Sequence, residues 1–286
     1  MCKDSIDGRY HKSHGDPLQV VWISGMPRSG TTWLSQIFAS SPDVRLKFCP
    51  LYSYEFKNAL DEHSSADDWH KLFAVVYNTT SEFLDQEYLR KKGLVPAFME
   101  KKDQPGHLVI KSTRFHQLVP NILRLHPTIR FVHLVRHPCA TIYSWLSNPY
   151  EFPQGADPRV EWRSGACRKN GIGEFWGFDD WKKVTAQALR LEDEYPGRFR
   201  IVRYERLAQS PTQSTQKIFS YCGIPYGKQT EAFVELSQSK HDVNKRSVFK
   251  NPALSKNWRE KLDQSIIREI TEDLRGTVLE QFVMTD

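Results

Sequence analysis

The stretch Leu18-Gln-Val-Val-Trp-Ile-Ser-Gly25-Met-Pro-Arg28-Ser-Gly30-Thr-Thr-Trp33 decides the fold of this 286-residue chain. Residues 18–24 form a short, largely apolar run, which predicts a buried strand. A loop bounded by two glycines follows, and apolar residues then recur at helical spacing over residues 31–40. A strand, a glycine-containing loop and a helix in this order are typical of the first unit of a parallel α/β sheet.

Three more short apolar runs predict strands at residues 108–111, 131–135 and 199–203. Helices are predicted at residues 139–146 and 179–195. We therefore expect an α/β fold of three layers, in which a parallel sheet is flanked by helices and a P-loop-type turn follows the first strand.

The segments outside these elements are less regular in sequence. We expect residues 54–102 to be mostly helical, and the chain after residue 205 to be helical except at 240–257. Residues 148–178 are rich in aromatic side chains without clear periodicity. A segment of that length without regular structure is functional or disordered, and its aromatic content favours function.

No linker or internal repeat divides the chain, so we expect a flexible arm at residues 1–17 and a single domain at residues 18–286. The composition, with 39% hydrophobic and 26% charged residues, is ordinary for a soluble protein. The N-terminal residues lack an apolar core, and no stretch is long enough to cross a membrane. Five cysteines without paired spacing indicate a reducing compartment. We therefore expect a cytoplasmic protein.

The net charge of +6 is compatible with nucleic acid, a membrane surface or a small polyanion as partner. The basic residues are scattered and form no stripe, which favours the small polyanion.

The loop after the first strand has the features of a phosphate cradle. Backbone N–H groups of the loop and of the first helical turn converge there, and the helix dipole adds partial positive charge. Gly30 permits close approach of an anion. The hydroxyls of Ser29, Thr31 and Thr32 add hydrogen-bond donors, and Arg28 adds a cation.

The same spacing of glycines occurs in the phosphate loop of nucleoside triphosphatases, but Thr31 stands where those proteins have Lys. The sequence Gly-Met-Pro-Arg-Ser-Gly-Thr-Thr-Trp resembles instead the 5′-phosphosulfate loop of sulfotransferases that use 3′-phosphoadenosine 5′-phosphosulfate (PAPS). Arg rather than Lys before Ser-Gly is similar to the carbohydrate and protein-tyrosine branches. The resemblance implies that residues 28–33, including Trp33, bind the donor and that Arg28 is catalytic.

Two more cations follow predicted strands. Arg136 ends one strand and Ser144 lies eight residues on, a pattern that resembles the family's 3′-phosphate motif. Lys111 ends another strand, and parallel strands present their carboxyl ends at one edge of the sheet. The resemblance implies that Lys111 contacts the sulfuryl group and the bridging oxygen, where an ammonium stabilises the charge on the leaving phosphate. No Asp follows these strands to organise Mg²⁺, so no metal is expected.

Two further segments resemble the family's donor site. Tyr204, in Val-Arg-Tyr-Glu-Arg-Leu, is similar to a Tyr that lies near the adenine, and a core aromatic is the alternative interpretation. Lys250 is similar to a residue of the loop that closes over the donor, with Lys245, Arg246 and Ser247 as neighbours.

The acceptor must lose a proton as it attacks sulfur, so a general base is expected. The family's positions for a Glu or a His base hold Cys49 and Thr113 here. A thiol, with a pKa of about 8.5, is a poor replacement for a carboxylate. We predict Glu55 as the base. His116, or an amine acceptor that needs little help, are the alternatives.

Together these residues predict a sulfotransferase that moves a sulfuryl group from PAPS to a hydroxyl or amine of a carbohydrate or small-metabolite acceptor. The product would be 3′-phosphoadenosine 5′-phosphate (PAP). Alternatives are a P-loop kinase of a nucleotide or small molecule, and a non-catalytic protein that binds anions or nucleotides. We expect residues 148–178 to line the acceptor side, and no nucleic-acid or membrane partner. The sequence is also compatible with a homodimer.

Overall fold

The computed structural model describes residues 18–249 and 256–284, and its five described strands form one parallel sheet. They are β1 (Gln19–Ser24), β2 (Val44–Phe48), β3 (His107–Lys111), β4 (Arg130–Val135) and β5 (Phe199–Arg203). Their order across the sheet is β2-β3-β1-β4-β5. In this register Ile23 lies opposite Lys111, and Ser24 opposite His133. The loops that follow these strands therefore meet at one edge of the sheet.

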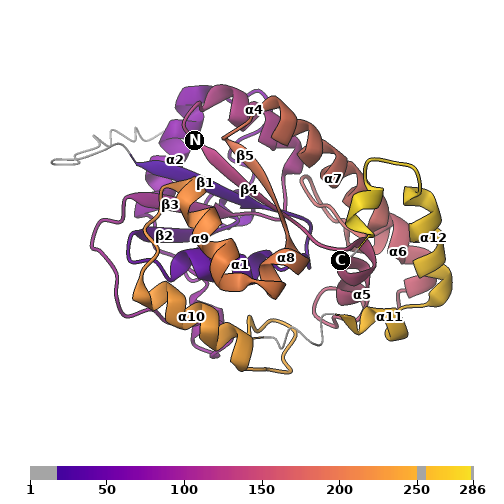
Figure 1. Ribbon diagram of the computed structural model, residues 1–286. Coiled ribbons are helices and arrows are strands. Elements are labelled where there is room, and N and C mark those ends of the chain that lie inside the picture. Colours follow the sequence, from indigo (N-terminus) through magenta and orange to yellow (C-terminus); the bar gives the residue numbers. More distant parts are fainter. Residues whose placement is uncertain (1–17, 250–255, 285–286) are drawn as a thin grey trace.

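Helices cover both faces of the sheet, which gives the expected three layers (Figure 1). One face packs against α1 (Thr31–Ala39), α9 (Pro211–Cys222) and α10 (Lys228–Ser239). The other face packs against α2 (Ala66–Asn78), α4 (Val119–Leu125) and α7 (Gly177–Glu194). Successive side chains of a strand point to opposite faces of the sheet, so each face has its own apolar cluster. Ile23 belongs to the cluster on the first face and Trp22 to the cluster on the second.

A third group of helices lies beside the sheet, on the right in Figure 1. It comprises α5 (Pro138–Leu146), α6 (Pro158–Ser164), α11 (Trp258–Lys261) and α12 (Gln264–Leu274), packed around the end of α7. The short helix α8 (Tyr204–Gln209) continues directly from β5. No helix within the described ranges has the length and apolar character needed to cross a bilayer.

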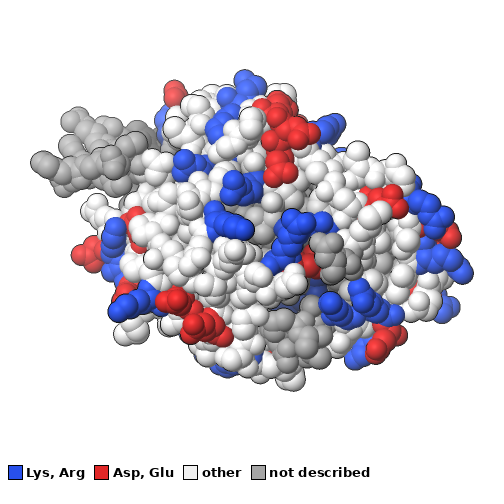
Figure 2. All heavy atoms as spheres, viewed as in Figure 1, with Lys and Arg blue, Asp and Glu red and all other residues white. Residues whose placement is uncertain are grey.

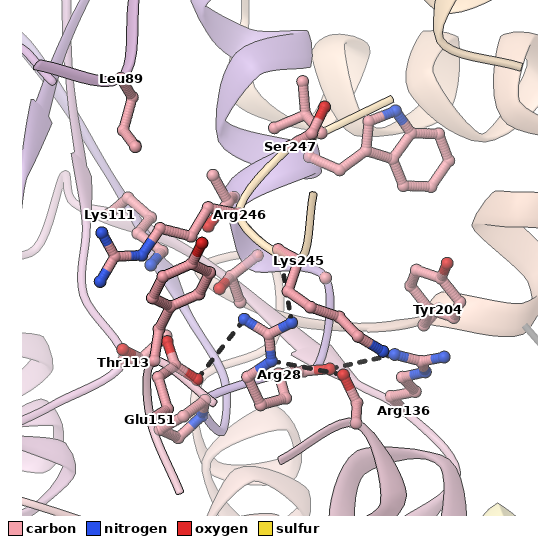
Figure 3. A pocket seen from close by; sticks show the side chains of 18 of the residues that line it. Arg28, Leu89, Lys111, Thr113, Arg136, Glu151, Tyr204, Lys245, Arg246 and Ser247 are labelled. Carbon is pink, nitrogen blue, oxygen red and sulfur yellow. Dashed lines mark hydrogen bonds and ion pairs between the residues drawn. The ribbon is translucent and has the colours of Figure 1, made fainter. Parts of the chain in front are cut away.

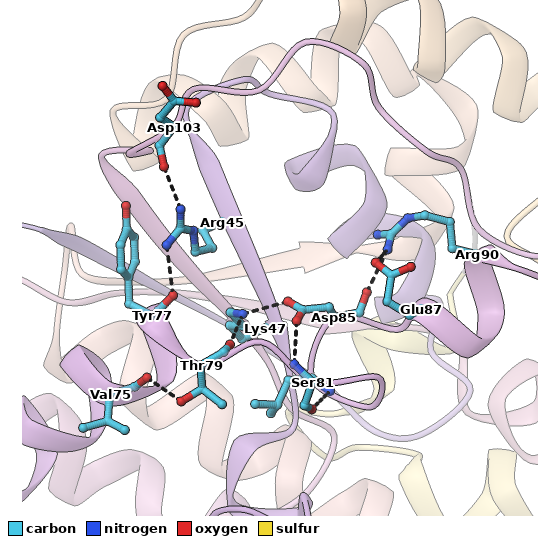
Figure 4. Close-up of polar contacts among 11 residues, drawn as sticks. Arg45, Lys47, Val75, Tyr77, Thr79, Ser81, Asp85, Glu87, Arg90 and Asp103 are labelled. Carbon is cyan, nitrogen blue, oxygen red and sulfur yellow. Dashed lines mark hydrogen bonds and ion pairs between the residues drawn. The ribbon is translucent and has the colours of Figure 1, made fainter.

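The strand β2 is absent from the sequence prediction because charged residues interrupt its apolar pattern. Lys47 is nevertheless buried, with 3% of its surface exposed. Its ammonium lies 2.7 Å from Asp85 and also donates to the carbonyl of Thr79 (Figure 4). Buried charge of this kind is stable only when it is paired, and the partners come from a distant segment.

The prediction that residues 54–102 are mostly helical is wrong. The described helices there are α2, which Ser65 begins with a capping box, and the short α3 (Glu87–Arg90). Contacts with Lys47 hold residues 79–85 in an irregular path against β2 (Figure 4). Conversely, the segment 148–178 contains α6, which Asp157 caps and Pro158 begins.

Candidate functional site

A pocket of about 640 Å³ opens where the strands end. Every strand contributes to its lining, since residues at or just beyond the carboxyl end of each one face the cavity. These residues are Arg28 after β1, Cys49 after β2, Lys111 and Thr113 at β3, Arg136 after β4 and Tyr204 after β5. This is the place at which parallel α/β sheets bind their ligands.

The loop between β1 and α1 needs glycine at both ends. A side chain at Gly25 would lie 2.5 Å from the carbonyl oxygen of Leu134, and one at Gly30 would lie 2.6 Å from the ring of Tyr204. No side chain among the described residues caps α1, which leaves the N–H groups of its first turn available to an anion. Gly30 and the following residues Thr31, Thr32 and Trp33 all line the pocket.

Arg28 lies at the centre of the site and has a left-handed backbone, with φ of 71°. Its guanidinium donates to the hydroxyl of Ser144 at 3.3 Å and to the carbonyl of Lys245 at 3.2 Å, and it lies 3.4 Å from Oε2 of Glu151 (Figure 3). Burial lowers the pKa of Arg28, Glu151 opposes this shift, and Arg136 adds to it. The side chain is thus fixed by three separate segments.

Arg136 lies on the opposite side of Arg28 from Glu151 (Figure 3). Its Nη1 donates to the carbonyl of Arg28 at 3.1 Å, and its guanidinium lies 4.5 Å from the ring centre of Tyr204. The Nε atom of Arg136 is buried and has no hydrogen-bond partner within the described residues. A bound anion would supply that missing acceptor. Ser144, the predicted partner of Arg136, also lines the pocket.

Lys111 is a buried cation, with 4% of its surface exposed. Its Nζ lies 4.4 Å from the ring centre of Phe48. Burial lowers the pKa of Lys111, while Cys49 and Glu151 act in the opposite direction. An ammonium in such a position favours any ligand that brings negative charge to it.

Tyr204 lines the pocket beside the loop between β1 and α1. Its ring packs edge-on against Trp33, with 6.1 Å between the ring centres, and lies within 2.7 Å of the position that a Cβ on Gly30 would take. Trp33 is in turn held by a hydrogen bond from its indole to Ser237, at 3.0 Å. The structure therefore brings residues 28 and 30–33 together with Arg136, Ser144, Tyr204 and Lys111 in one pocket, and their part in binding a donor stays a prediction.

Two other predicted residues, Ser29 and Glu55, do not line the pocket. Ser29 is fully buried, its hydroxyl has no partner within the described residues, and it does not line the pocket. Glu55 is exposed on a turn outside the pocket, where hydrogen bonds from its own backbone, Ser81 and Ser53 outweigh desolvation and lower its pKa. Lys250 lies outside the described residues.

The alternative base His116 is buried behind the pocket, between the rings of His133 and Phe175. Burial lowers its pKa to about 4. It does not line the pocket, whereas Cys49 and Thr113 do.

The side of the pocket away from Tyr204 is aromatic and basic. Arg114 forms an ion pair with Glu174 and lies 3.7 Å from the ring centre of Tyr52. Arg246 lies over Tyr150 at 4.4 Å. From the segment 148–178, the residues that line the pocket are Tyr150, Glu151, Arg168 and Trp176. That segment therefore does contribute to the pocket, as expected.

Sequence reasoning missed Glu151, Arg168 and Lys261. Glu151 follows a turn in which its N–H donates to the carbonyl of Asn148, at 3.0 Å. The Asn148-Pro149 pair is a turn signal, but nothing in the local pattern shows that the turn faces Arg28.

Residues 20–228 match the sequence model of the sulfotransferase family. That range covers more than half of the chain, and the fold and site described above agree with it. The chain belongs to the sulfotransferase family, so the prediction of a sulfotransferase-family enzyme is confirmed.

The relatives of this chain include proteins named for two different kinds of acceptor. It is 24% identical over 265 residues to a protein of Caenorhabditis briggsae named as a protein-tyrosine sulfotransferase, covering 89% of this chain and 85% of that one. It is 25% identical over 203 residues to human carbohydrate sulfotransferase 6, covering 60% of this chain and 47% of the human protein. The match thus spans about half the length of the human relative.

Among solved structures, mouse sulfotransferase SULT7A1 in complex with PAP is similar in fold, with a TM-score of 0.55 and 14% identity. The comparison covers 94% of this chain and 88% of the mouse chain. The predicted parallel α/β fold with a P-loop-type turn is confirmed.

Proposed function

We propose that the protein transfers the sulfuryl group of PAPS to an acceptor and releases PAP. One observation carries the proposal: Arg28, Lys111 and Arg136 converge around the uncapped start of α1 in a single pocket. A phosphosulfate brings negative charge to the loop, and a 3′-phosphate brings a second anionic group. Separated cations with open backbone donors suit a ligand with two anionic ends.

Each cation has a separate part in this reaction. The open N–H groups of α1 and Arg28 hold the 5′-phosphosulfate, and Arg136 holds the 3′-phosphate with the donor that now lacks a partner. Lys111 stabilises the charge that appears on the bridging oxygen as the S–O bond breaks. A buried ammonium is effective there because water does not screen it.

We propose a hydroxyl or amine of a carbohydrate or small metabolite as the acceptor. The support is the aromatic and basic wall formed by Tyr52, Tyr88, Tyr150, Trp176 and Arg114. Aromatic faces pack well against sugar rings and flat metabolites. Tyrosine in a peptide is the competing acceptor, because relatives carry both kinds of name.

The first experiment is a transfer assay with PAPS and three sets of acceptors: oligosaccharides, amino sugars and tyrosine peptides. Mass spectrometry detects the added sulfuryl group. We expect transfer to persist with a chelator present, because the three cations meet the charge of the donor. Transfer that stops on chelation, or depends on ATP instead of PAPS, would contradict the proposal.

Lys111→Met tests the catalytic part of the site, with Lys91→Met as the control because Lys91 is exposed and paired with Glu82. We expect Lys111→Met to lower kcat by about 100-fold or more, the usual cost of one electrostatic contact to a transition state. PAP binding, measured by calorimetry, should change much less. Equal kcat values for the two variants would rule out this role of Lys111.

A further inference from the structure

One carboxylate lines the pocket among many cations. The cationic side chains of the described lining are Arg28, Lys111, Arg114, Arg136, Arg168, Lys245, Arg246 and Lys261. The carboxylate is Glu151, and no Asp is present in that lining. A carboxylate in a site for an anionic donor opposes donor binding. We therefore expect the role of Glu151 to concern the acceptor.

Glu151 is held at the boundary between the two halves of the pocket. Tyr150, which precedes it, belongs to the aromatic wall, and Oε2 of Glu151 lies 3.4 Å from Nη1 of Arg28. About a quarter of its side chain is exposed (27%), and Oε2 is buried against the guanidinium of Arg28. Figure 3 shows it on the side of Arg28 that faces away from Arg136.

The charge of Glu151 reaches both cations that handle the sulfuryl group. It opposes the lowering of the pKa of Arg28 and that of Lys111. A carboxylate with this placement can accept a proton from a group that approaches the sulfur.

We infer that Glu151 is the general base that deprotonates the acceptor. In this step the acceptor oxygen forms a bond to sulfur and gives its proton to Glu151. The bond between sulfur and the bridging oxygen breaks, and its electron pair stays on the phosphate of PAP. No oxidation takes place. The inference rests on the proposed sulfuryl transfer.

Arg28 is the contact that Glu151 and the proposed phosphosulfate would share. In the structure Glu151 pairs with Arg28. A bound phosphosulfate competes for the same guanidinium and draws its charge toward the sulfate oxygens, which leaves Glu151 available to the acceptor.

The other groups that could take this role are less well placed. Glu55 lies outside the pocket and His116 is buried behind it. Glu174 is paired with Arg114: although burial acts to raise the pKa of Glu174, this pair lowers it. His241 lines the pocket on the donor side, shortly after Ser237, the partner of Trp33.

The test compares Glu151→Gln with Glu269→Gln, which removes a half-exposed carboxylate from α12. We expect Glu151→Gln to lower kcat by about 100-fold or more, the typical share of general-base catalysis. Its kcat should lose the acidic limb of the wild-type pH profile. PAP should bind at least as tightly as to the wild type, because a competitor for Arg28 is gone. Glu151→Asp should recover part of the rate.

Different results distinguish failure of the proposed function from failure of the role of Glu151. A wild-type protein that binds PAP but sulfates none of the probe oligosaccharides, amino sugars or tyrosine peptides refutes the proposed function, and the role of Glu151 with it. An active wild type with an unchanged kcat in Glu151→Gln refutes the role of Glu151 alone. Weaker PAP binding in that variant would show that Glu151 merely holds Arg28, and a large loss in Glu55→Gln would move the base to Glu55.

Discussion

Substitution of Gly30 by Ala tests the tight contact on which the donor cradle depends. The added Cβ would lie 2.6 and 2.7 Å from two atoms of the Tyr204 ring, nearly 1 Å inside ordinary contact of about 3.5 Å. The ring must move away by about that distance, and Arg136, which lies over it at 4.5 Å, moves with it. The change therefore reaches both ends of the donor.

The substitution has two separate effects, one on folding stability and one on PAP affinity. The φ of Gly30 is 93°, and an L-residue in a left-handed conformation costs about 1–2 kcal/mol of folding free energy. Displacement of Arg136 weakens one charged hydrogen bond to the ligand, which contributes about 1.5–3 kcal/mol. We therefore expect PAP affinity to fall roughly 10- to 100-fold, since 1.4 kcal/mol corresponds to tenfold.

Gly197→Ala is the matched control for this experiment. Gly197 has a similar φ of 80°, but a Cβ there meets no atom within 4 Å. It should share the loss of stability, measured by urea unfolding, and bind PAP normally in calorimetry. If Gly30→Ala bound PAP as tightly as Gly197→Ala, the contact with Tyr204 would not matter, and the reasoning would be refuted.

Two further predictions concern folding stability and the pocket. Lys47→Met removes the ion pair with Asp85 and should lower the free energy of unfolding by about 2–3 kcal/mol, measured with urea. Because that pair holds a segment that lines the pocket, the KM for the acceptor should rise while PAP affinity stays constant. An unchanged KM would contradict this link. Burial lowers the pKa of His116 and His137 to about 4 and that of His133 to about 3, so the folded state binds fewer protons than the unfolded state between these values and about 6.5. The stability that neutral histidines provide is therefore complete above about pH 6.5 and is lost as the pH falls toward 4, by up to about 1.4 kcal/mol per pH unit for each histidine; a melting temperature that is flat from pH 7 to 5 would contradict this.

The position of Arg28, Lys111 and Arg136 in one pocket could be predicted because the signals in the sequence are local. Gly25 and Gly30 mark the loop by their spacing, and Lys111 and Arg136 each end an apolar run. Parallel pairing of the strands then brings the ends of those runs to the same edge of the sheet, and this inference does not require knowing how the side chains pack. The strands β1, β3, β4 and β5 were predictable for the same reason.

The rest of the pocket lining depends on backbone turns and distant contacts that leave no periodic signal. Cys49 has a left-handed φ of 41°, and the chain turns there into a 3₁₀ helix (Pro50–Tyr52), so that Glu55 lies outside the pocket although it is close in sequence. Glu151 meets Arg28 across more than a hundred residues. Such proximity results from tertiary packing of the helices beside the sheet.

Lys and Arg side chains occur across the face drawn in Figure 2, with Asp and Glu among them. The concentration of cations in the pocket is therefore not repeated as a uniform basic stripe on this face. Net charge by itself says little about the site, whereas the ends of individual strands locate it.

The contacts that close the cradle also make its assembly depend on complete synthesis. Arg28 donates to the carbonyl of Lys245, a residue made 217 positions later, and Trp33 bonds Ser237, made 204 positions later. A growing chain therefore presents its glycine loop long before the partners that fix Arg28 and Trp33 exist. Contacts this distant in sequence form slowly, so firm donor binding would distinguish finished molecules from truncated ones.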